Sequence, residues 1–503
     1  MNCKIRKIVL LVLVIALSMF SSVVAYASEI EVPEDIRIGL HYGSKAVKTL
    51  TLSSPGGIKI GICSNGEFEL IEEIDADKEI VITRGSEPGT VKINGVGEIG
   101  SEDEYPYFKS IEDDEIAIIE INGKKYRGNV EIRRFSDSDM TVINHLSMQE
   151  YLYGVVPREI GGNSPIEAVK AQAIVARTYA TKNYGRREGW GFDLYPTVDD
   201  QAYGGYEWEN ANSNQAVDET DGQVVVYDGE LIGGYYFSTS GGYTESSENV
   251  WGGKLEYLRA VPDYYEPEVD GNTTWEVEYT AQEIKEKLEA KGIHIGEILE
   301  IEPVEYTEAG RVLELKVIGT EEEVTLTKSK TREYLGLKSQ WYTVNDEAPE
   351  VKEIEDDDLP INREEIKEED EWWLKEETEE SEKNNKDEEY IVIHPDYTTD
   401  IENVTVKEEE KKKEMKPLLK AIVERILGKS KEANTEEIEE KSEIEEIHTK
   451  YEATRSNTTF TFRGRGWGHA VGMSQNGAKG MAEEGFSCEE IICWYYSGVE
   501  VVN

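Results

Sequence analysis

The sequence predicts an α+β protein that is rich in strands and has a few short helices. Three observations support this fold class. Short alternating apolar and polar segments fill the chain from Ile36 to Val142, with Gly, Asn, Asp or Ser between them. A helical pattern follows a Gly-Gly-Asn turn at 161–163, and a long acidic stretch interrupts the chain before strand-like residues return at Thr459.

The first 28 residues have the pattern of an export signal. Three basic residues precede a short apolar run, and small residues flank a cleavage pattern at Ala25-Tyr26-Ala27. A membrane-spanning helix needs about 20 apolar residues, so we expect a signal peptide, with an uncleaved anchor as the open alternative. Either way, we expect the remainder to be extracytoplasmic.

Charge and cysteine content restrict the partners and the scaffold. The chain has 104 Asp and Glu against 54 Lys and Arg, a net charge of −50, which argues against nucleic acid or anionic lipid as a partner. Beyond residue 28 only Cys63, Cys488 and Cys493 remain, too few for a disulfide scaffold. Cys488 and Cys493 point to different sides of one predicted helix, so we expect no bridge between them.

Composition divides the chain beyond the signal. We predict a β-rich region over 30–142, a mixed region over 143–344, an acidic segment over 345–457 and a return to ordered chain over 458–503. The acidic segment holds 39 Asp and Glu against 18 Lys and Arg, which favours a partly disordered insertion. Strand-like WYTV precedes it and strand-like TFTF follows it, so both flanks belong to one domain.

The acidic segment contains one helical pattern of its own. PLLKAIVERIL (417–427) places its apolar residues on a single stripe, typical of an amphipathic helix. Such a helix can pack locally against another part of the insertion or dock onto a partner.

One stretch, GVVPREIGGNSPIEAVKAQAIVARTYA (154–180), carries the strongest chemical signal. Ser164, with Glu167 three residues later, predicts a capped helix that ends at Gly185. Arg177 lies at the edge of the apolar stripe, where its guanidinium needs a carboxylate, carbonyls or a ligand as partner. Glu159 is either a solvated loop charge or a catalytic acid, and the residues alone leave both interpretations open.

Other segments are rich in groups that suit a sugar chain. DDQAYGGYEW (199–208) and YYFSTSGGYTESSENVWGG (235–253) combine aromatic rings with hydroxyl and amide side chains, although these residues alone favour ordinary sheet packing with Gly-rich turns. The C-terminal RGRGWGHAVGMSQNGAKGMA has repeated glycines, and helices are predicted from Ser474 to Gly485 and from Ser487 onward. Motifs for nucleotide and metal chemistry are missing from the sequence.

Taken as a set, these blocks resemble the stage II sporulation protein D family, the SpoIID/LytB domain. The resemblance is carried, in the family's order, by LSMQEYLYGVVPREI, PIEAVKAQAIVARTYA, QAYGG, STSGGYTESSENVW and GRGWGHAVGMSQNGAKGMA. It covers most of 30–344 and 459–503. By this likeness 143–344 forms the catalytic core, and 458–503 is the C-terminal part of the same core.

The resemblance implies an exported lytic transglycosylase in sporulation or cell-wall remodelling. Family members cleave MurNAc–GlcNAc bonds of peptidoglycan strands that an amidase has stripped of peptides, and they promote that amidase. Glu159 matches the catalytic glutamate and Arg177 an arginine of the same site. Six further residues fall in matching blocks and are assigned to glycan binding or site architecture: Tyr179, Gln201, Tyr203, Ser240, His469 and Gln475.

The chain also departs from the family pattern. Members often have Glu-Met and a Trp near the turn, where this chain has Glu159-Ile160 and Gly-Gly-Asn, so we expect a reshaped cleft rim. Some members bind zinc through Cys and His near the position of Gln201; the local run Tyr195 to Asp200 has neither, so we expect no metal and no cofactor. A non-catalytic amidase activator that binds peptidoglycan is the rival interpretation, and a structural surface protein is a third.

Overall fold

The structure is a computed structural model that describes residues 30–111, 117–136, 138–269, 271–350 and 458–503. The described chain forms two compact units. Unit 1 contains the described part of Met1–Glu248, with Gly253–Pro267 and Ala470–Asn503. Unit 2 contains Asn249–Gly252 and the described part of Glu268–His469. Across these described ranges, no helix has both the length and the apolar character that a membrane crossing requires.

Several sequence predictions concern residues outside these ranges. The signal peptide over 1–28 lies there, as does the amphipathic helix at 417–427 with nearly all of the acidic segment. The predicted domain boundaries also remain predictions.

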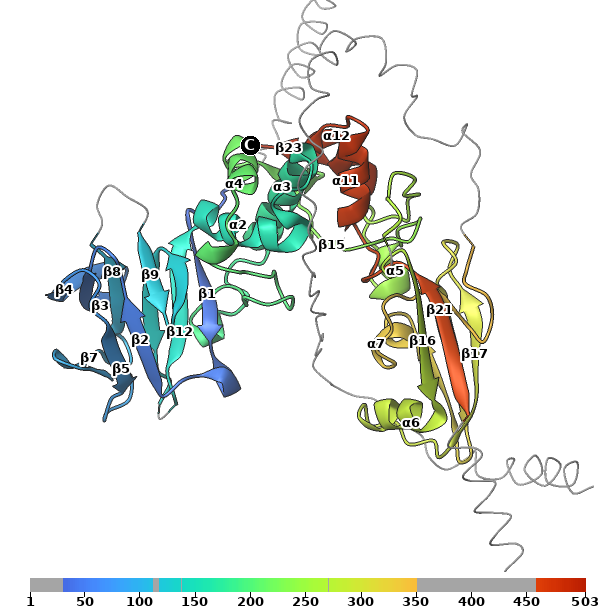
Figure 1. Ribbon diagram of the computed structural model, residues 1–503, viewed down its shortest axis with the longest axis horizontal. Coiled ribbons are helices and arrows are strands. Elements are labelled where there is room, and N and C mark those ends of the chain that lie inside the picture. Colours follow the sequence, from blue (N-terminus) through green and yellow to red (C-terminus); the bar gives the residue numbers. More distant parts are fainter. Residues whose placement is uncertain (1–29, 112–116, 137, 270, 351–457) are drawn as a thin grey trace, which may run out of the picture. The chain divides into compact units, whose positions relative to one another are not determined.

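Unit 1 begins with two six-stranded sheets, as the alternating pattern predicts (Figure 1). The first has the order β1-β12-β11-β8-β3-β4 and contains β1 (Asp35–His41), β3 (Ile58–Ser64), β4 (Glu67–Ile74), β8 (Tyr105–Ser110), β11 (Asn129–Arg133) and β12 (Thr141–Ser147). The second has the order β10-β9-β2-β5-β6-β7 and contains β2 (Thr49–Ser53), β5 (Ile80–Arg84), β6 (Val91–Ile93), β7 (Gly97–Ile99), β9 (Ile118–Ile121) and β10 (Lys124–Arg127). A short helix η1 (Gly43–Lys45) follows β1.

Alternate residues of these strands enter one shared core. Leu50 and Leu52 of the second sheet and Ile58 and Ile60 of the first are fully buried in the same cluster. Because side chains of a strand alternate between its faces, one face of each sheet supplies the apolar residues. The strand-rich part of the fold prediction is confirmed.

A helical layer completes unit 1 around one central helix, α3 (Ile166–Lys182). It is contacted by α2 (Met148–Val156), α4 (Ala211–Glu219), α11 (Gln475–Glu483) and α12 (Cys488–Tyr495). Figure 1 shows the two C-terminal helices, in red, beside α3. The remaining elements are η2 (Pro157–Gly161), η3 (Glu188–Trp190), η4 (Tyr206–Trp208), β13 (Val224–Tyr227), β14 (Glu230–Leu231), β15 (Tyr236–Phe237), α5 (Ser247–Val250, which crosses the unit border), β22 (Met473–Ser474) and β23 (Glu500–Val502).

The C-terminal segment joins strands from the middle of the chain. β22 pairs in parallel with β15, and β23 pairs antiparallel with β13. These pairings place the N-terminus of α11 next to the segment that follows β15, so residues more than 200 positions apart meet in one part of unit 1.

The predicted caps of α3 are wrong, whereas those of the C-terminal helices are confirmed. Ser164 does not cap α3, because its hydroxyl donates to the carbonyl oxygen of Ile160 at 2.7 Å. The Glu167 carboxylate instead accepts from the backbone N–H of Cys488 at 2.8 Å, and α3 ends at Lys182 rather than at Gly185. Ser474 caps α11, and Ser487 forms a capping box on α12.

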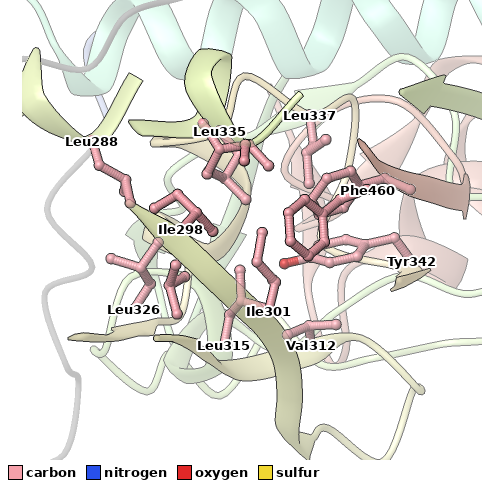
Figure 2. Close-up of a cluster of buried hydrophobic side chains, with 14 of the residues drawn as sticks. Leu288, Ile298, Ile301, Val312, Leu315, Leu326, Leu335, Leu337, Tyr342 and Phe460 are labelled. Carbon is pink, nitrogen blue, oxygen red and sulfur yellow. The ribbon is translucent and has the colours of Figure 1, made fainter. Parts of the chain in front are cut away.

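Unit 2 has two three-stranded sheets around its own core. One has the order β16-β21-β20, with β16 (Thr274–Thr280), β20 (Tyr342–Val344) and β21 (Thr459–Arg465). The other has the order β17-β18-β19, with β17 (Ile298–Tyr306), β18 (Val312–Gly319) and β19 (Glu323–Thr327), and the helices are α6 (Ala281–Glu289) and α7 (Lys330–Glu333). Figure 2 shows how Leu315 and Ile301 of one sheet gather with Tyr342 and Phe460 of the other in a single apolar core.

The strands on either side of the acidic segment are direct neighbours. Val344 of β20 pairs with Phe462 of β21, and the backbone N–H of Asn345 donates to the carbonyl oxygen of Thr461 at 2.7 Å. The chain therefore leaves a sheet at 345 and re-enters the same sheet at 459.

Candidate active site

Glu159 lies in a π-helical turn, η2, directly after α2. α2 starts with a capping box between Ser147 and Glu150 and stops where Pro157, which has no N–H to donate, begins the wider turn. Gly161 closes the turn with φ of 89°, a conformation that favours glycine. Single π-turns of this kind are frequent at functional sites.

Three groups hold the Glu159 carboxyl. Oε1 accepts from the backbone N–H of Ala202 at 2.7 Å, and Oε2 lies 3.5 Å from Nε2 of Gln475. Tyr236 of β15 adds a hydrogen bond from its hydroxyl. Burial raises the pKa of Glu159 above its usual range, more than these hydrogen bonds and the nearby Arg158 charge lower it. The residue still has partial solvent access, which a proton donor to a large substrate requires.

Of the predicted residues, Gln475 lies at this carboxyl, and Gln201 reaches it through the hydroxyl of Tyr236. Nε2 of Gln475 also lies 3.3 Å from Oε1 of Gln172, a fully buried side chain of α3. Gln201 donates to the hydroxyl of Tyr236 at 3.1 Å, and its Oε1 accepts from Tyr151 at 3.2 Å. A chain of amides and hydroxyls thus surrounds Glu159.

Sequence reasoning missed Gln172, Tyr236 and Ala202. A glutamine in the alanine-rich stripe of α3 was a usable signal for Gln172, because a buried amide needs partners. Nothing in the sequence singled out Ala202, since it contributes only its backbone N–H.

Tyr179 acts one step away, through Asp200. Its hydroxyl donates to Oδ1 of Asp200 at 3.2 Å, while Nε of Arg187 and the backbone N–H of Tyr195 reach Oδ2 at 3.3 and 2.8 Å. Asp200 is therefore committed to fixing the loop that presents Gln201 and Ala202 to Glu159.

Tyr203 and Arg177 are held by the fold itself. The Tyr203 hydroxyl donates to Oδ1 of Asn144 at 2.8 Å in the sheet below. Arg177 is fully buried, and its guanidinium donates to the carbonyl oxygens of Gln223 and Val217, each at 3.2 Å. Of the partners considered for Arg177, the carbonyls are found and Glu159 is not, and its expected role in substrate binding stays a prediction.

Ser240 lies at a second group of carboxyls in unit 1. Its backbone N–H and its hydroxyl donate to Glu266 at 2.6 and 3.1 Å, and the Ser474 hydroxyl donates to the same carboxylate at 2.9 Å. Asp263 is buried nearby and accepts from the Tyr495 hydroxyl at 2.8 Å. Burial and mutual repulsion raise the pKa of Glu266 to about 8, and burial raises that of Asp263 to about 6.

His469 belongs to unit 2, whereas the other predicted site residues belong to unit 1. Its imidazole ring lies 5.1 Å, centroid to centroid, from the ring of Trp251.

The Gly-Gly-Asn turn is anchored to the start of α4. The carbonyl oxygen of Gly162 accepts from Nδ2 of Asn212, and Oδ1 of Asn163 accepts from Nδ2 of Asn210, both at 2.9 Å. The turn that follows Glu159 is thus fixed to α4 by amide side chains. Across the described ranges, no three or more His, Cys, Asp or Glu side chains are grouped so that they can hold a metal ion.

Chemically, the site offers one protonatable carboxyl among neutral donors. The amide of Gln475 and the Tyr236 hydroxyl can orient hydroxyl-rich ligands, and Glu159 can exchange a proton with such ligands. Gln201 is buried and supports Tyr236.

Part of the chain, including Glu159, is similar to known proteins. Residues 136–227 match the family described as "Stage II sporulation protein", and residues 256–356 match a domain of unknown function (DUF8618). The chain is 26% identical over 389 residues to the amidase enhancer of Bacillus subtilis (strain 168), covering 76% of this chain and 45% of that protein.

Two further relatives cover shorter stretches. An uncharacterised protein of Brachyspira hyodysenteriae (strain ATCC 49526 / WA1) is 39% identical over 145 residues, or 28% of this chain and 38% of that protein. Stage II sporulation protein D of Bacillus subtilis (strain 168) is 30% identical over 167 residues, or 30% of this chain and 48% of that protein. The chain thus spans about half the length, or less, of the curated relatives it matches.

Proposed function

The chain contains a domain of the stage II sporulation protein family, and on that premise we propose that it is an exported lytic transglycosylase. Its substrate is the glycan strand of peptidoglycan from which peptides have been removed. Its setting is sporulation or cell-wall remodelling outside the cytoplasm. The observation that carries the proposal is Glu159, the family's catalytic glutamate by position, with a raised pKa at the centre of a polar network.

The proposed reaction uses one carboxyl twice. Protonated Glu159 donates its proton to the GlcNAc O4 while the bond from MurNAc C1 to that oxygen breaks. The resulting carboxylate then accepts the proton of the MurNAc C6 hydroxyl while O6 bonds to C1. The product is a 1,6-anhydro sugar, and no water is consumed.

The surroundings of Glu159 support a single-acid route. A hydrolytic glycosidase needs a second carboxylate to activate water or attack the sugar. Asp200, two residues before Ala202 in the loop that binds Glu159, is tied to Arg187 and to the backbone of Tyr195. Ala202 and Gln475 stabilise the carboxylate form after the first transfer, while burial keeps the acid form available before it.

A second candidate function is amidase enhancement without catalysis. It is favoured by the match to the Bacillus subtilis amidase enhancer, which extends over 76% of this chain. In this role the residues around Glu159 hold glycan strands, and a cell-wall amidase is the partner.

One assay separates the two functions. Wild type and Glu159→Gln are incubated with peptide-free glycan, and separately with peptide-bearing peptidoglycan and a cell-wall amidase. If the protein is a transglycosylase, wild type should release anhydro products, and Glu159→Gln should release them about 10²–10⁴-fold more slowly. Amidase stimulation by both proteins, with no anhydro product from wild type, identifies the enhancer instead.

A further inference from the structure

An exposed tryptophan, Trp208, contacts Arg158, the residue that precedes Glu159 in the chain. The guanidinium Cζ of Arg158 is 4.1 Å from the ring centroid of Trp208, a cation–π contact. The Trp208 side chain is nevertheless 45% exposed, so this contact leaves much of the indole open to solvent.

The local fold fixes this pair relative to the carboxyl. Arg158 precedes Glu159 in the same π-helical turn. Trp208 ends η4 and lies against Gly204, where a side chain would collide with the indole. Gly204 is two residues from Ala202, which binds Glu159, so the turn and the loop that hold the acid also carry the pair.

Arg158 and Arg127 both lie over aromatic rings of unit 1 but differ in their ion pairs. Arg127 stacks on Tyr153 and Tyr206 and also binds Glu209, with Nη2 to Oε2 at 2.7 Å. Among the residues that the structure describes, no carboxylate forms an ion pair with Arg158. In a chain with a net charge of −50, an arginine that forms no ion pair with any acid of the described residues can bind an anionic ligand at this position.

We propose that Arg158 and Trp208 form a subsite for MurNAc with a free lactyl carboxylate, and that Arg158 is the residue that distinguishes peptide-free from peptide-bearing strands. This inference rests on the proposed function. Trp208 packs against an apolar face of a sugar ring, and Arg158 forms a charged hydrogen bond with the lactyl carboxylate. When a peptide is attached, that carboxylate is an amide, so the charge that Arg158 binds is absent.

Binding measured without turnover tests this inference. The parent is the full chain with Glu159→Gln, and the probes are fluorescently labelled peptide-free strands, the same strands with lactyl carboxylates converted to methylamides, and peptide-bearing strands. We expect the parent to bind free-carboxylate strands about tenfold or more tightly than methylamide strands. When Arg158→Gln is introduced into the parent, the affinities for free-carboxylate and methylamide strands should become equal. A higher salt concentration should reduce the difference between these two affinities in the parent.

Matched variants separate charge from ring contact. Lys92→Gln removes one positive charge from an exposed position on β6 and should leave the preference unchanged. Trp208→Ala should weaken the binding of both kinds of strand by about tenfold, and Trp208→Phe should restore that binding. Trp190→Ala, which alters another tryptophan of unit 1 that is 42% exposed, should change neither affinity.

Three results overturn the inference. An unchanged preference in Arg158→Gln, or peptide-bearing strands that bind the parent as tightly as free strands, removes the role of Arg158 while leaving the proposed function intact. Failure of the parent to bind any strand removes the proposed function as well.

Discussion

The carboxylate of Glu159 is held by the backbone of a residue 43 positions away, the N–H of Ala202, at 2.7 Å. This bond holds Oε1, while Oε2 has a long contact with Gln475, and the Tyr236 hydroxyl also donates to the carboxyl. The long contact with Gln475 is weak, so a substrate oxygen can replace it.

The first prediction concerns pH. The active form of Glu159 is protonated, so activity is present below its pKa and lost as pH rises through it. Burial places that pKa above the usual range, and the amide of Gln475 lowers it by favouring the carboxylate. Gln475→Leu should therefore move the descending limb of kcat/KM toward higher pH. Gln215→Leu, an exposed change on α4, is the control; a limb that stays in place in Gln475→Leu contradicts this account.

Arg177 provides a prediction about stability. Its guanidinium is fully buried against two backbone carbonyls, and desolvation lowers its pKa to about 10. Arg177→Met leaves the carbonyl oxygens of Gln223 and Val217 without this donor, so we expect a loss of about 2–4 kcal/mol in urea unfolding. The folded variant should retain its KM. Unchanged stability with a raised KM would instead establish the substrate contact that the family resemblance implies.

The Asp263 and Glu266 carboxyls predict how stability depends on pH. The pKa of Asp263 is raised to about 6 and that of Glu266 to about 8. Their contribution to the free energy of unfolding is therefore full below pH 4 and is lost as pH rises through those values. Glu266→Gln removes the group with the higher pKa, so the variant should lose less stability than wild type as pH rises. Between pH 5 and pH 8.5, the free energy of unfolding of the variant relative to wild type should increase by on the order of 1–3 kcal/mol. Denaturant titrations of both proteins at both pH values measure these free energies of unfolding. If the difference between variant and wild type is the same at pH 5 and pH 8.5, the raised pKa of Glu266 is contradicted.

A deletion tests the sheet that spans the acidic segment. Because Val344 and Phe462 are paired on neighbouring strands, replacing residues 351–457 with a short Gly linker should leave unit 2 folded. Shortening the loop adds at most about 3 kcal/mol of stability through lower closure entropy. Thermal unfolding and near-ultraviolet circular dichroism of the deletion variant check this. Loss of the tertiary signal would mean that the segment is required for the sheet.

How far the sequence predicts the fold depends on the range of the interaction. The strands from Ile36 to Val142 were predictable because alternation is a local property that burial on one face imposes. The absence of a capping box at Ser164 was not predictable, because it depends on a tertiary contact. Glu167 binds the backbone N–H of Cys488 instead of closing the capping box.

The site follows the same division. The family motif identified Glu159, and the glutamines at 201 and 475 were recognisable as polar residues among glycines and aromatics. Ala202 was not recognisable, since it contributes only a backbone N–H. That N–H reaches Glu159 because Asp200 fixes the loop. Arg158 and Trp208 lie 50 residues apart, and no pattern in the chain indicates that they meet.

The central claim is that Glu159 catalyses transglycosylation without water. The direct measurement is mass spectrometry of products from peptide-free glycan, with the reaction run in ¹⁸O-labelled water by wild type and Glu159→Gln. We predict wild-type products that are lighter than the hydrolysis products by one water and carry no ¹⁸O, and about 10²–10⁴-fold less product from Glu159→Gln. Reducing ends that carry ¹⁸O, or anhydro products released equally by Glu159→Gln, would contradict the claim.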